Sequence, residues 1–217
     1  MLKLLKKEFT LSMHPTGYIM LAGAILTLIP GYPYTVSCFY MGLAIYFICL
    51  TGRENHDITF TLMLPVSRED AVKARILMAC CLEMAQLTLV ALMILLKQLI
   101  GNPPNPAGLD AGLALIGDCF ITYAIFNMIF FPGYYRDINK PGKAFMFASV
   151  AVFAWIALVT VGTYTVPFLR DVLDQPDPAR IQDKLLFTLG GLGLYIAGTA
   201  LAEVHSAKQF SQVDLSL

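Results

Sequence analysis

Four polar side chains within apolar blocks are the residues of this chain most able to do chemistry. Glu83 and Gln86 lie in the third block, three residues apart and so on one face of a helix. Asp118 and Asn127 lie in the fourth block. Polar and ionisable groups inside a membrane are costly and often functional. Two interpretations stay open: a polar substrate path or proton-coupling site, and hydrogen bonds that only join neighbouring helices.

Sequence motifs for catalysis are missing. The nearest approach to a phosphate-binding loop, at Gly142-Lys143, has Ala144 after the lysine and Asp137 at the first glycine position. The patterns His-Glu-x-x-His and Gly-x-Ser-x-Gly do not occur, the histidines are scattered, and no Cys-x-x-Cys is present. We therefore predict that the chain is not an enzyme and binds no metal or cofactor itself.

The composition is that of a membrane protein. The chain is 57% hydrophobic and 14% charged, with a mean hydropathy of +0.67, whereas a soluble domain is about a quarter charged. Apolar blocks long enough to approach or span a bilayer occur at about 16–29, 35–50, 70–100, 109–131, 143–166 and 185–204.

These blocks predict an all-α membrane protein of six transmembrane helices, forming one domain over residues 1–217. The fourth helix is expected to break at Pro132-Gly133. A re-entrant hairpin formed by the two short first blocks remains the alternative to two separate spans.

The basic residues alternate between the gaps that separate these blocks. One set of gaps and ends is rich in them: Lys3, Lys6, Lys7, Arg53, Arg68, Lys73, Arg75, Arg136, Lys140, Lys143 and Lys208. The other gaps carry few. Because short loops rich in Lys and Arg stay in the cytoplasm, we predict a multi-pass protein of the plasma membrane with both termini, residues 53–70 and residues 134–142 inside. No nucleic-acid partner is predicted.

The N-terminal residues 1–14 form a separate element. Apolar residues recur every three to four positions, and polar ones fall on other faces; the apolar set is Leu2, Leu5, Phe9 and Met13, and the polar set is Lys3, Lys6, Lys7 and Thr10. Such a pattern predicts a basic amphipathic helix lying in the membrane interface. His14-Pro15 would end it.

The segment 53–69, between the second and third blocks, is the most distinctive. Charged residues begin it, an apolar run follows at residues 60–64, and Ser67 is placed to cap the next helix, with Asp70 three positions on. An apolar centre with a charged rim suits a docking element. A loop that packs on its own helices is the alternative.

Several of these stretches together resemble one family. Leu-Leu-Lys-Lys-Glu-Phe at residues 4–9, His14-Pro15, Pro-Gly-Tyr-Pro-Tyr at residues 30–34 and the segment from Arg53 to Arg75 are similar to those of small six-span type-2 ABC permeases. In particular, they resemble the phenol-soluble-modulin and antimicrobial-peptide exporters of Gram-positive bacteria. The resemblance covers the whole chain, and its specific motifs lie in residues 1–75.

The resemblance implies a bacterial permease subunit that pairs with a second copy and recruits a separate ATPase, which would hold ATP and Mg. It implies a cytoplasmic coupling helix between spans two and three, formed or flanked by Glu54, Asp57, Phe60, Leu62, Met63, Leu64 and Arg68. It also implies a connector helix with Lys3, Lys6, Lys7 and Phe9. A small hairpin often precedes the last span in this family, and here 167–184 would host it.

The function that follows is ATP-driven export of amphipathic, membrane-active peptides. Two alternatives remain. One is a non-transporting immunity or regulatory membrane protein. The other is a proton-coupled secondary transporter that uses Glu83 and Asp118.

Overall fold

The computed structural model describes residues 1–101 and 103–213, and these residues contain helices and loops but no β-strand. The helical elements are α1 (Leu2–Lys7), η1 (Glu8–Ser12), α2 (Pro15–Leu21), η2 (Ala22–Leu28), α3 (Val36–Glu54), α4 (Asp57–Leu62), α5 (Arg68–Ile100), α6 (Leu113–Arg136), α7 (Pro141–Thr165), η3 (Leu169–Leu173) and α8 (Ile181–Ser211).

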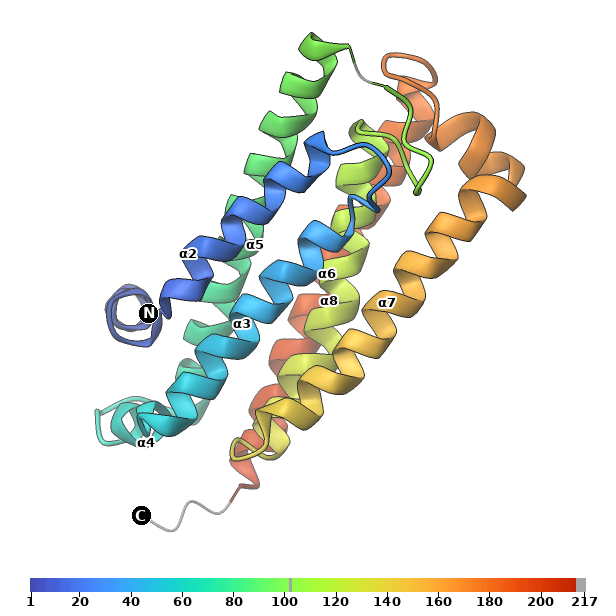
Figure 1. Cartoon of the computed structure of the whole chain (residues 1–217). Coiled ribbons are helices and arrows are strands. Elements are labelled where there is room, and N and C mark those ends of the chain that lie inside the picture. Colours follow the sequence, from blue (N-terminus) through green and yellow to red (C-terminus); the bar gives the residue numbers. More distant parts are fainter. Residues whose placement is uncertain (102, 214–217) are drawn as a thin grey trace.

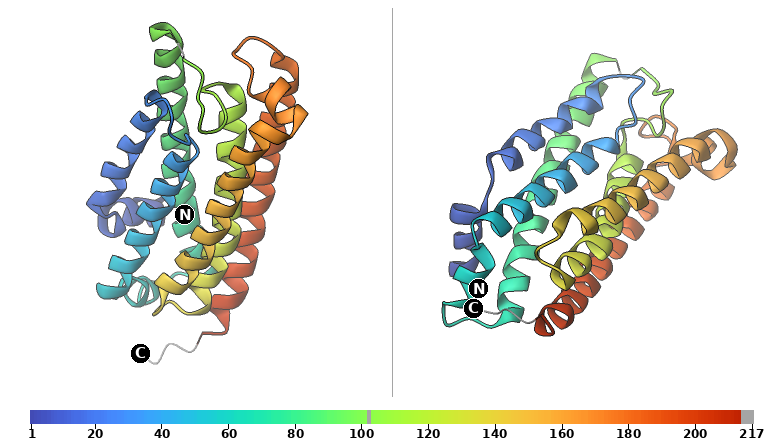
Figure 2. Two further views of the ribbon diagram at one scale, coloured as in Figure 1. Left: turned by 45° about the vertical axis from the view of Figure 1, so that its right-hand side comes forward. Right: turned by 60° about the horizontal axis from the view of Figure 1, so that its bottom comes forward.

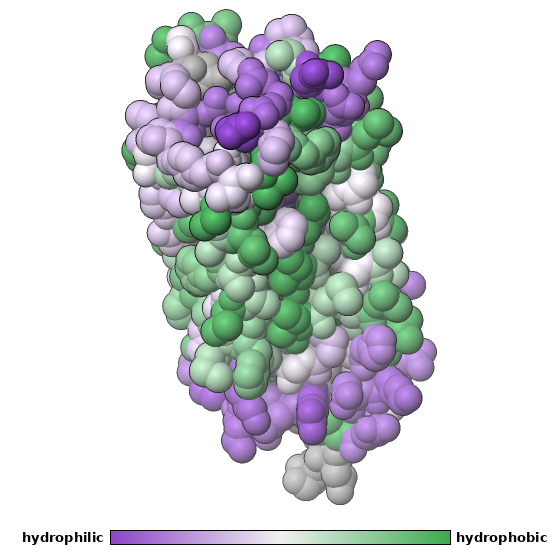
Figure 3. All heavy atoms as spheres, turned by 90° about the vertical axis from the view of Figure 1, so that its right-hand side faces the viewer, coloured by the Kyte–Doolittle hydropathy of each residue, from purple (hydrophilic) through white to green (hydrophobic). Residues whose placement is uncertain are grey.

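Five of these helices, α3, α5, α6, α7 and α8, are long and apolar enough to cross a membrane. They run side by side as an elongated bundle (Figures 1 and 2). On the face that Figure 3 shows, an apolar band separates two hydrophilic ends, as a bilayer-spanning bundle requires. The prediction of an all-α membrane protein is confirmed.

The sixth candidate span is a bent pair of helical stretches, and its crossing part is the second stretch, α2 followed by η2. The helical residues before it, Leu2–Ser12, meet Pro15–Leu28 at 91°, which suits a helix lying along the membrane surface before a crossing segment. The second half, η2, is a 3₁₀-helix. At about 1.5 Å per α-helical residue and about 2.0 Å per 3₁₀ residue, the two halves together reach about 24 Å. Because each 3₁₀ residue rises further along the axis than an α-helical residue, this short segment covers most of a hydrocarbon core of about 30 Å.

Helix α6 lies between α7 and α8 and packs extensively on both. The contact with α8 is close at Gly191, where a Cβ atom would stand 2.5 Å from the carbonyl oxygen of Gly117. Toward the other end of α6, Phe126, Phe130 and Tyr134 stack with ring centroids 5.0 and 6.0 Å apart. All three are buried, so the aromatic run of α6 forms core.

The expected break of the fourth span at Pro132-Gly133 is wrong, because α6 continues through both residues to Arg136. Membrane helices tolerate an internal proline when neighbouring groups satisfy the freed carbonyl. Gly133 also suits close packing, since a Cβ there would lie 3.0 Å from the Cβ of Ala144 in α7. Arg136 consequently stands at a helix end.

The two ends of the bundle hold different connections (Figures 1 and 2). One end gathers α4, the start of α5, the α6–α7 connection and the end of α8. The opposite end holds the turn at 29–35, the connection between α5 and α6, and the segment 166–180. Asn102, in the connection between α5 and α6, lies outside the described residues. This grouping agrees with the alternation predicted from charge, and which end faces the cytoplasm stays a prediction.

The segment before the last helix contains one helical turn, η3, followed by a loop to Arg180. Its anchor is Lys184, a buried residue at the start of α8 that forms an ion pair of 2.7 Å with Asp177. Asp177 also accepts a hydrogen bond of 2.9 Å from the backbone N–H of Leu113, at the first turn of α6. These contacts join α6, α8 and the loop between α7 and α8.

Candidate functional site

The short helix α4 stands apart from the spans that flank it. Helix α3 ends at Glu54, and His56 turns the chain in a left-handed conformation with φ of 51°. Helix α4 then stops at Leu62, shortly before Pro65, which lacks the N–H that a longer helix would need. Ser67 caps α5 as predicted, its side chain accepting a hydrogen bond of 3.0 Å from the backbone N–H of Asp70.

Apolar side chains of this segment divide between two directions. Ile58 and Leu62 pack against the core of the bundle. Phe60, Met63 and Leu64 point outward and are 50%, 72% and 39% exposed. One face therefore fixes the segment to the bundle, and the other leaves an apolar surface free at the end of the molecule. We call Phe60, Met63 and Leu64 the apolar tip.

A buried cluster of charged side chains holds α4 in place. Asp57 accepts from Lys7 of the N-terminal helix and from Arg75 of α5. Arg75 Nε lies 2.5 Å from Oε2 of Glu8, and Lys7 Nζ lies 3.1 Å from Oε1 of the same residue. Ser12 Oγ donates to Asp57 Oδ2 at 2.9 Å. Two cations and two carboxylates thus compensate one another across three separate parts of the chain; we call these four residues and Ser12 the charge cluster.

The electrostatics of Asp57 favour its ionised form. Burial by itself raises the pKa of this carboxyl, but Arg75 and Lys7 outweigh burial and leave the pKa below its ordinary value. Lys7 Nζ also donates to Thr61 Oγ1 at 2.8 Å, one turn further along α4. The N-terminal helix is therefore attached to α4 at two successive turns.

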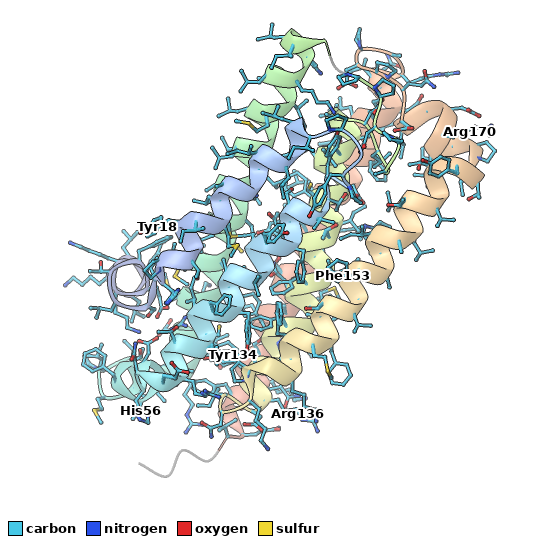
Figure 4. The ribbon with its side chains drawn as sticks, viewed as in Figure 1. Tyr18, His56, Tyr134, Arg136, Phe153 and Arg170 are labelled. Atoms are coloured by element: carbon cyan, nitrogen blue, oxygen red, sulfur yellow. The ribbon has the colours of Figure 1, made fainter. Side chains whose placement is uncertain are left out.

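A groove of about 250 Å³ lies beside the apolar tip, and its lining comes from η1, the end of α3 and α4: Leu11, Ser12, Thr51, Gly52, Asn55, Asp57 and Phe60. The groove places exposed Phe60 next to the buried charge cluster. Figure 4 shows His56 at this end of the bundle, where the chain turns from α3 into α4.

The predicted residues of this region fall into three environments. Glu54 is exposed and lies 3.4 Å from Arg53. Arg68 donates to the carbonyls of Phe210 and Val213, both at 2.8 Å, and so joins the start of α5 to the end of α8. Asp57 is buried in the charge cluster, and Leu62 packs on the bundle, so the segment turns both side chains toward its own protein.

The N-terminal helix faces the bundle differently from the prediction. Lys3 and Lys6 are exposed and Phe9 packs against the core, whereas Lys7 turns inward. The expected outward placement of Lys7 is wrong because Glu8 and Ser12 share the inward stripe begun by Leu4, and partners there compensate its charge. Glu8, Ser12, Arg75 and Thr61 were not predicted as site residues. The four-residue spacing of positions 4, 8 and 12 was the available signal.

Glu83 and Asn127 meet in the interior of the bundle. Asn127 Nδ2 donates to Glu83 Oε2 at 3.1 Å and lies 3.2 Å from Thr199 Oγ1. Tyr195 Oη donates to the same carboxylate oxygen at 2.6 Å. Glu83 is fully buried, and its contacts connect α5 to both α6 and α8. Tyr195 and Thr199 were not predicted as members of this group.

Asp118 and Gln86 make separate contacts with other helices. Asp118 accepts from Thr35 Oγ1 at 2.6 Å and from Trp155 Nε1 at 2.8 Å, which joins α6 to the start of α3 and to α7. The side-chain amide of Gln86 has partners for both its nitrogen and its oxygen when the nitrogen faces Leu21. It then donates to the carbonyl of Leu21 at 3.0 Å and accepts from the N–H of Ala24 at 3.2 Å. Gln86 therefore lies beside the junction of α2 and η2. All four predicted intramembrane residues have partners on other helices.

Among residues 1–101 and 103–213, no three His, Cys, Asp or Glu side chains converge in a way that could hold a metal ion. The fold and the interhelical polar contacts define a multi-pass, all-α membrane protein. A family profile described as "ABC-2 family transporter protein" matches residues 3–201, and the chain belongs to this family. It is the membrane permease subunit of an ABC transporter, and the family implies an ATPase partner. No curated protein and no solved structure matches the chain.

Proposed function

We propose that this chain is the permease of an ATP-driven exporter and that segment 53–69 docks its ATPase. The observation that carries the proposal is the apolar tip, Phe60, Met63 and Leu64, exposed on and directly after a short helix that buried charges fix in position. ATP and Mg would lie on the partner subunit. A rigidly held apolar surface with polar surroundings has the anatomy of an interface centre.

The charge cluster gives this docking element a route into the membrane-spanning part. A partner that moves α4 also moves Asp57, which is paired with Lys7 of the N-terminal helix and with Arg75 of α5. Packed helices shift as units because a close-packed interior does not deform continuously. Displacement of α4 is therefore passed to the N-terminal helix and to α5 together.

The proposal also includes pairing of the permease with a second copy and outward transport of amphipathic, membrane-active peptides. The resemblance of residues 1–75 to peptide-exporting permeases supports both parts. In this scheme Glu83 and Asp118 hold helices together, which is supported by their contacts with Asn127 and Tyr195, and with Thr35 and Trp155.

The docking experiment compares Phe60→Asp with Phe168→Asp. The two side chains are 50% and 51% exposed, but Phe168 belongs to the segment 166–180, which lies at the opposite end of the bundle from α4. The tagged wild-type chain is first used to recover its ATPase from native membranes, identified by a phosphate-loop motif. Loss of an interface-centre residue costs about 2 kcal/mol, or about 30-fold in affinity. We expect that loss for Phe60→Asp only; equal ATPase binding by both folded variants would refute the docking surface.

The cargo experiment uses the permease and ATPase reconstituted together in liposomes. ATP hydrolysis should rise more with a helical amphipathic peptide than with its scrambled counterpart. Composition and charge are equal in the two peptides, and only the first gathers its apolar side chains on one face of the helix. Equal stimulation would reject amphipathic peptides as cargo while leaving ATPase docking intact. Peptide movement driven by a pH gradient without ATPase would instead support the secondary-transporter alternative.

A further inference from the structure

A second cleft lies at the end of the bundle that carries α4, between the end of α6 and the start of α7. Its volume is about 410 Å³, and its lining consists of Gly133, Arg136, Asp137, Lys140, Lys143, Ala144 and Phe147. Figure 4 shows Arg136 at this end, close to the α6–α7 connection. The cleft is separate from the groove beside the apolar tip and from the charge cluster.

The charges of this cleft are not balanced. It contains three basic side chains and one carboxylate, that of Asp137. Lys140 lies 3.7 Å from Asp137, and both side chains are largely exposed, so the pair is weak. Within the part of the chain that the structure describes, Arg136 and Lys143 form no ion pair. The cleft therefore presents excess positive charge to a ligand.

The surface next to these cations is apolar. Met146, Phe147 and Val150 follow on α7 and are 54%, 53% and 65% exposed. They belong to α7, one of the helices long and apolar enough to cross a membrane. The basic residues lie at the end of α6 and at the start of α7. A ligand that satisfies both parts needs an anionic group joined to a hydrocarbon chain.

We propose that this cleft binds the headgroup phosphate of an anionic phospholipid, with the acyl chains lying along the exposed apolar face of α7. Arg136 supplies a planar guanidinium that matches phosphate oxygens, and Lys140 and Lys143 add two ammonium groups. Basic pockets between membrane helices at the cytoplasmic side suit such headgroups. The orientation proposed above makes this a lipid of the inner leaflet.

The cleft also adjoins the coupling segment. Arg53 Nη1 donates to the carbonyl of Asn139 at 3.2 Å, and Ile138 and Asn139 line a small pocket together with His56 and Thr59. A headgroup bound by the flanking cations would stabilise the α6–α7 connection, and this connection contacts the start of segment 53–69 through Arg53. This consequence rests on the proposed function, whereas lipid binding itself does not.

The test measures lipid binding to the purified full chain in detergent by native mass spectrometry. The probes are dioleoylphosphatidylglycerol, dioleoylphosphatidylcholine and inorganic phosphate. The test variant is Arg136→Gln with Lys143→Gln, and the matched control is Lys73→Gln with Lys208→Gln, which removes two exposed cations elsewhere at the same end of the bundle. We expect wild type to prefer phosphatidylglycerol. Removing each cleft cation should weaken that binding about fivefold, equivalent to about 1 kcal/mol, and the control should change it less than about twofold.

Three results would overturn the proposal. Equal losses in the test and control variants would indicate diffuse attraction. Equal binding of the two lipids by wild type would exclude charge recognition. Displacement of phosphatidylglycerol by inorganic phosphate at equal concentration would assign the cleft to a soluble anion. Thermal unfolding verifies the fold of each variant. If the double variant unfolds, Lys143→Gln alone replaces it, with Lys208→Gln as its control; an unchanged affinity for phosphatidylglycerol would then refute the site.

Discussion

Neutralising Asp57 tests whether charge pairing holds the coupling segment to the bundle. In Asp57→Asn, Lys7 and Arg75 lose their shared carboxylate in a buried site. Breaking a buried ion pair by removing one partner costs about 3–5 kcal/mol. Arg75 keeps Glu8 at 2.5 Å, so we expect the lower end of that range, about 3 kcal/mol.

The assay is equilibrium unfolding of the purified permease in mixed micelles, combined with hydrogen exchange of the peptide covering α4. Glu54→Gln is the matched control because it neutralises an exposed carboxylate three positions earlier, in a pair of 3.4 Å with Arg53; its cost should stay under about 1 kcal/mol. The α4 amides should lose protection in Asp57→Asn only. A loss of stability below about 1 kcal/mol in Asp57→Asn, with normal protection of α4, would show that packing of Ile58 and Leu62 suffices and that the charges do not hold the segment.

The sign of the pH effect follows from the same contacts. Because the pKa of Asp57 is lowered in the folded protein, its stabilisation is complete above the ordinary carboxyl pKa of about 3.9 and is lost as pH falls through the lower folded value. The contribution of Asp57 to the protection of α4 should therefore be constant from about pH 5 to 8. A marked decline of α4 protection as pH falls from about 8 to 5 would contradict the assignment of the ionised carboxylate.

Three further predictions concern other parts of the bundle. Glu83→Gln should cost under about 1.5 kcal/mol and keep ATP-driven transport, since the amide can still bond Asn127 and Tyr195; abolished transport in a folded variant would favour proton coupling. Gly191→Ala should destabilise by about 1–3 kcal/mol because its Cβ would strike backbone, whereas Gly190→Ala, with nothing within 4 Å, should not; equal thermal stabilities would contradict this contact. Burial raises the pKa of Asp174 to about 6, so stability should increase as pH falls from about 7 to 4, and Asp174→Asn should weaken that dependence in unfolding assays.

The spans were predictable because each depends on local composition. The third span, predicted at 70–100, is α5 at Arg68–Ile100, and the Ser67 cap is present. These features need only an apolar run and a nearby hydrogen-bonding side chain. The continuation of α6 past Pro132 was not predictable in the same way, because the groups that accommodate a proline come from neighbouring helices.

The charge cluster shows where sequence reasoning ends. Local pattern assigns Lys7 to a solvent face, since an isolated helix gains nothing by burying a cation. Its inward position becomes favourable only when Asp57, fifty residues later, and Arg75 of α5 complete the cluster. Similarly, Glu83 and Asp118 were recognisable as polar residues in spans, but their partners Tyr195 and Trp155 lie far away in the sequence.

The distribution of contacts suggests where the bundle can change shape. Helix α6 packs far more extensively on α7 and α8 than on α3 or α5. The helices thus form two groups, the first with α2, η2, α3 and α5 and the second with α6, α7 and α8, and smaller contacts of α3 with α7 and of α5 with α8 join them. In the interior of the bundle, Glu83 with Asn127 and Tyr195, and Thr35 with Asp118, form polar connections between these groups. At the end that carries α4, Arg53, Arg68 and Lys73 add connections to Asn139, to the end of α8 and to Glu203. The interior hydrogen bonds contribute about 0.5–1.5 kcal/mol each, enough to favour one arrangement and small enough to exchange. Because the charge cluster ties α4 to the first group only, a push on α4 acts across this boundary, and α6, α7 and α8 provide the opposing rigid body.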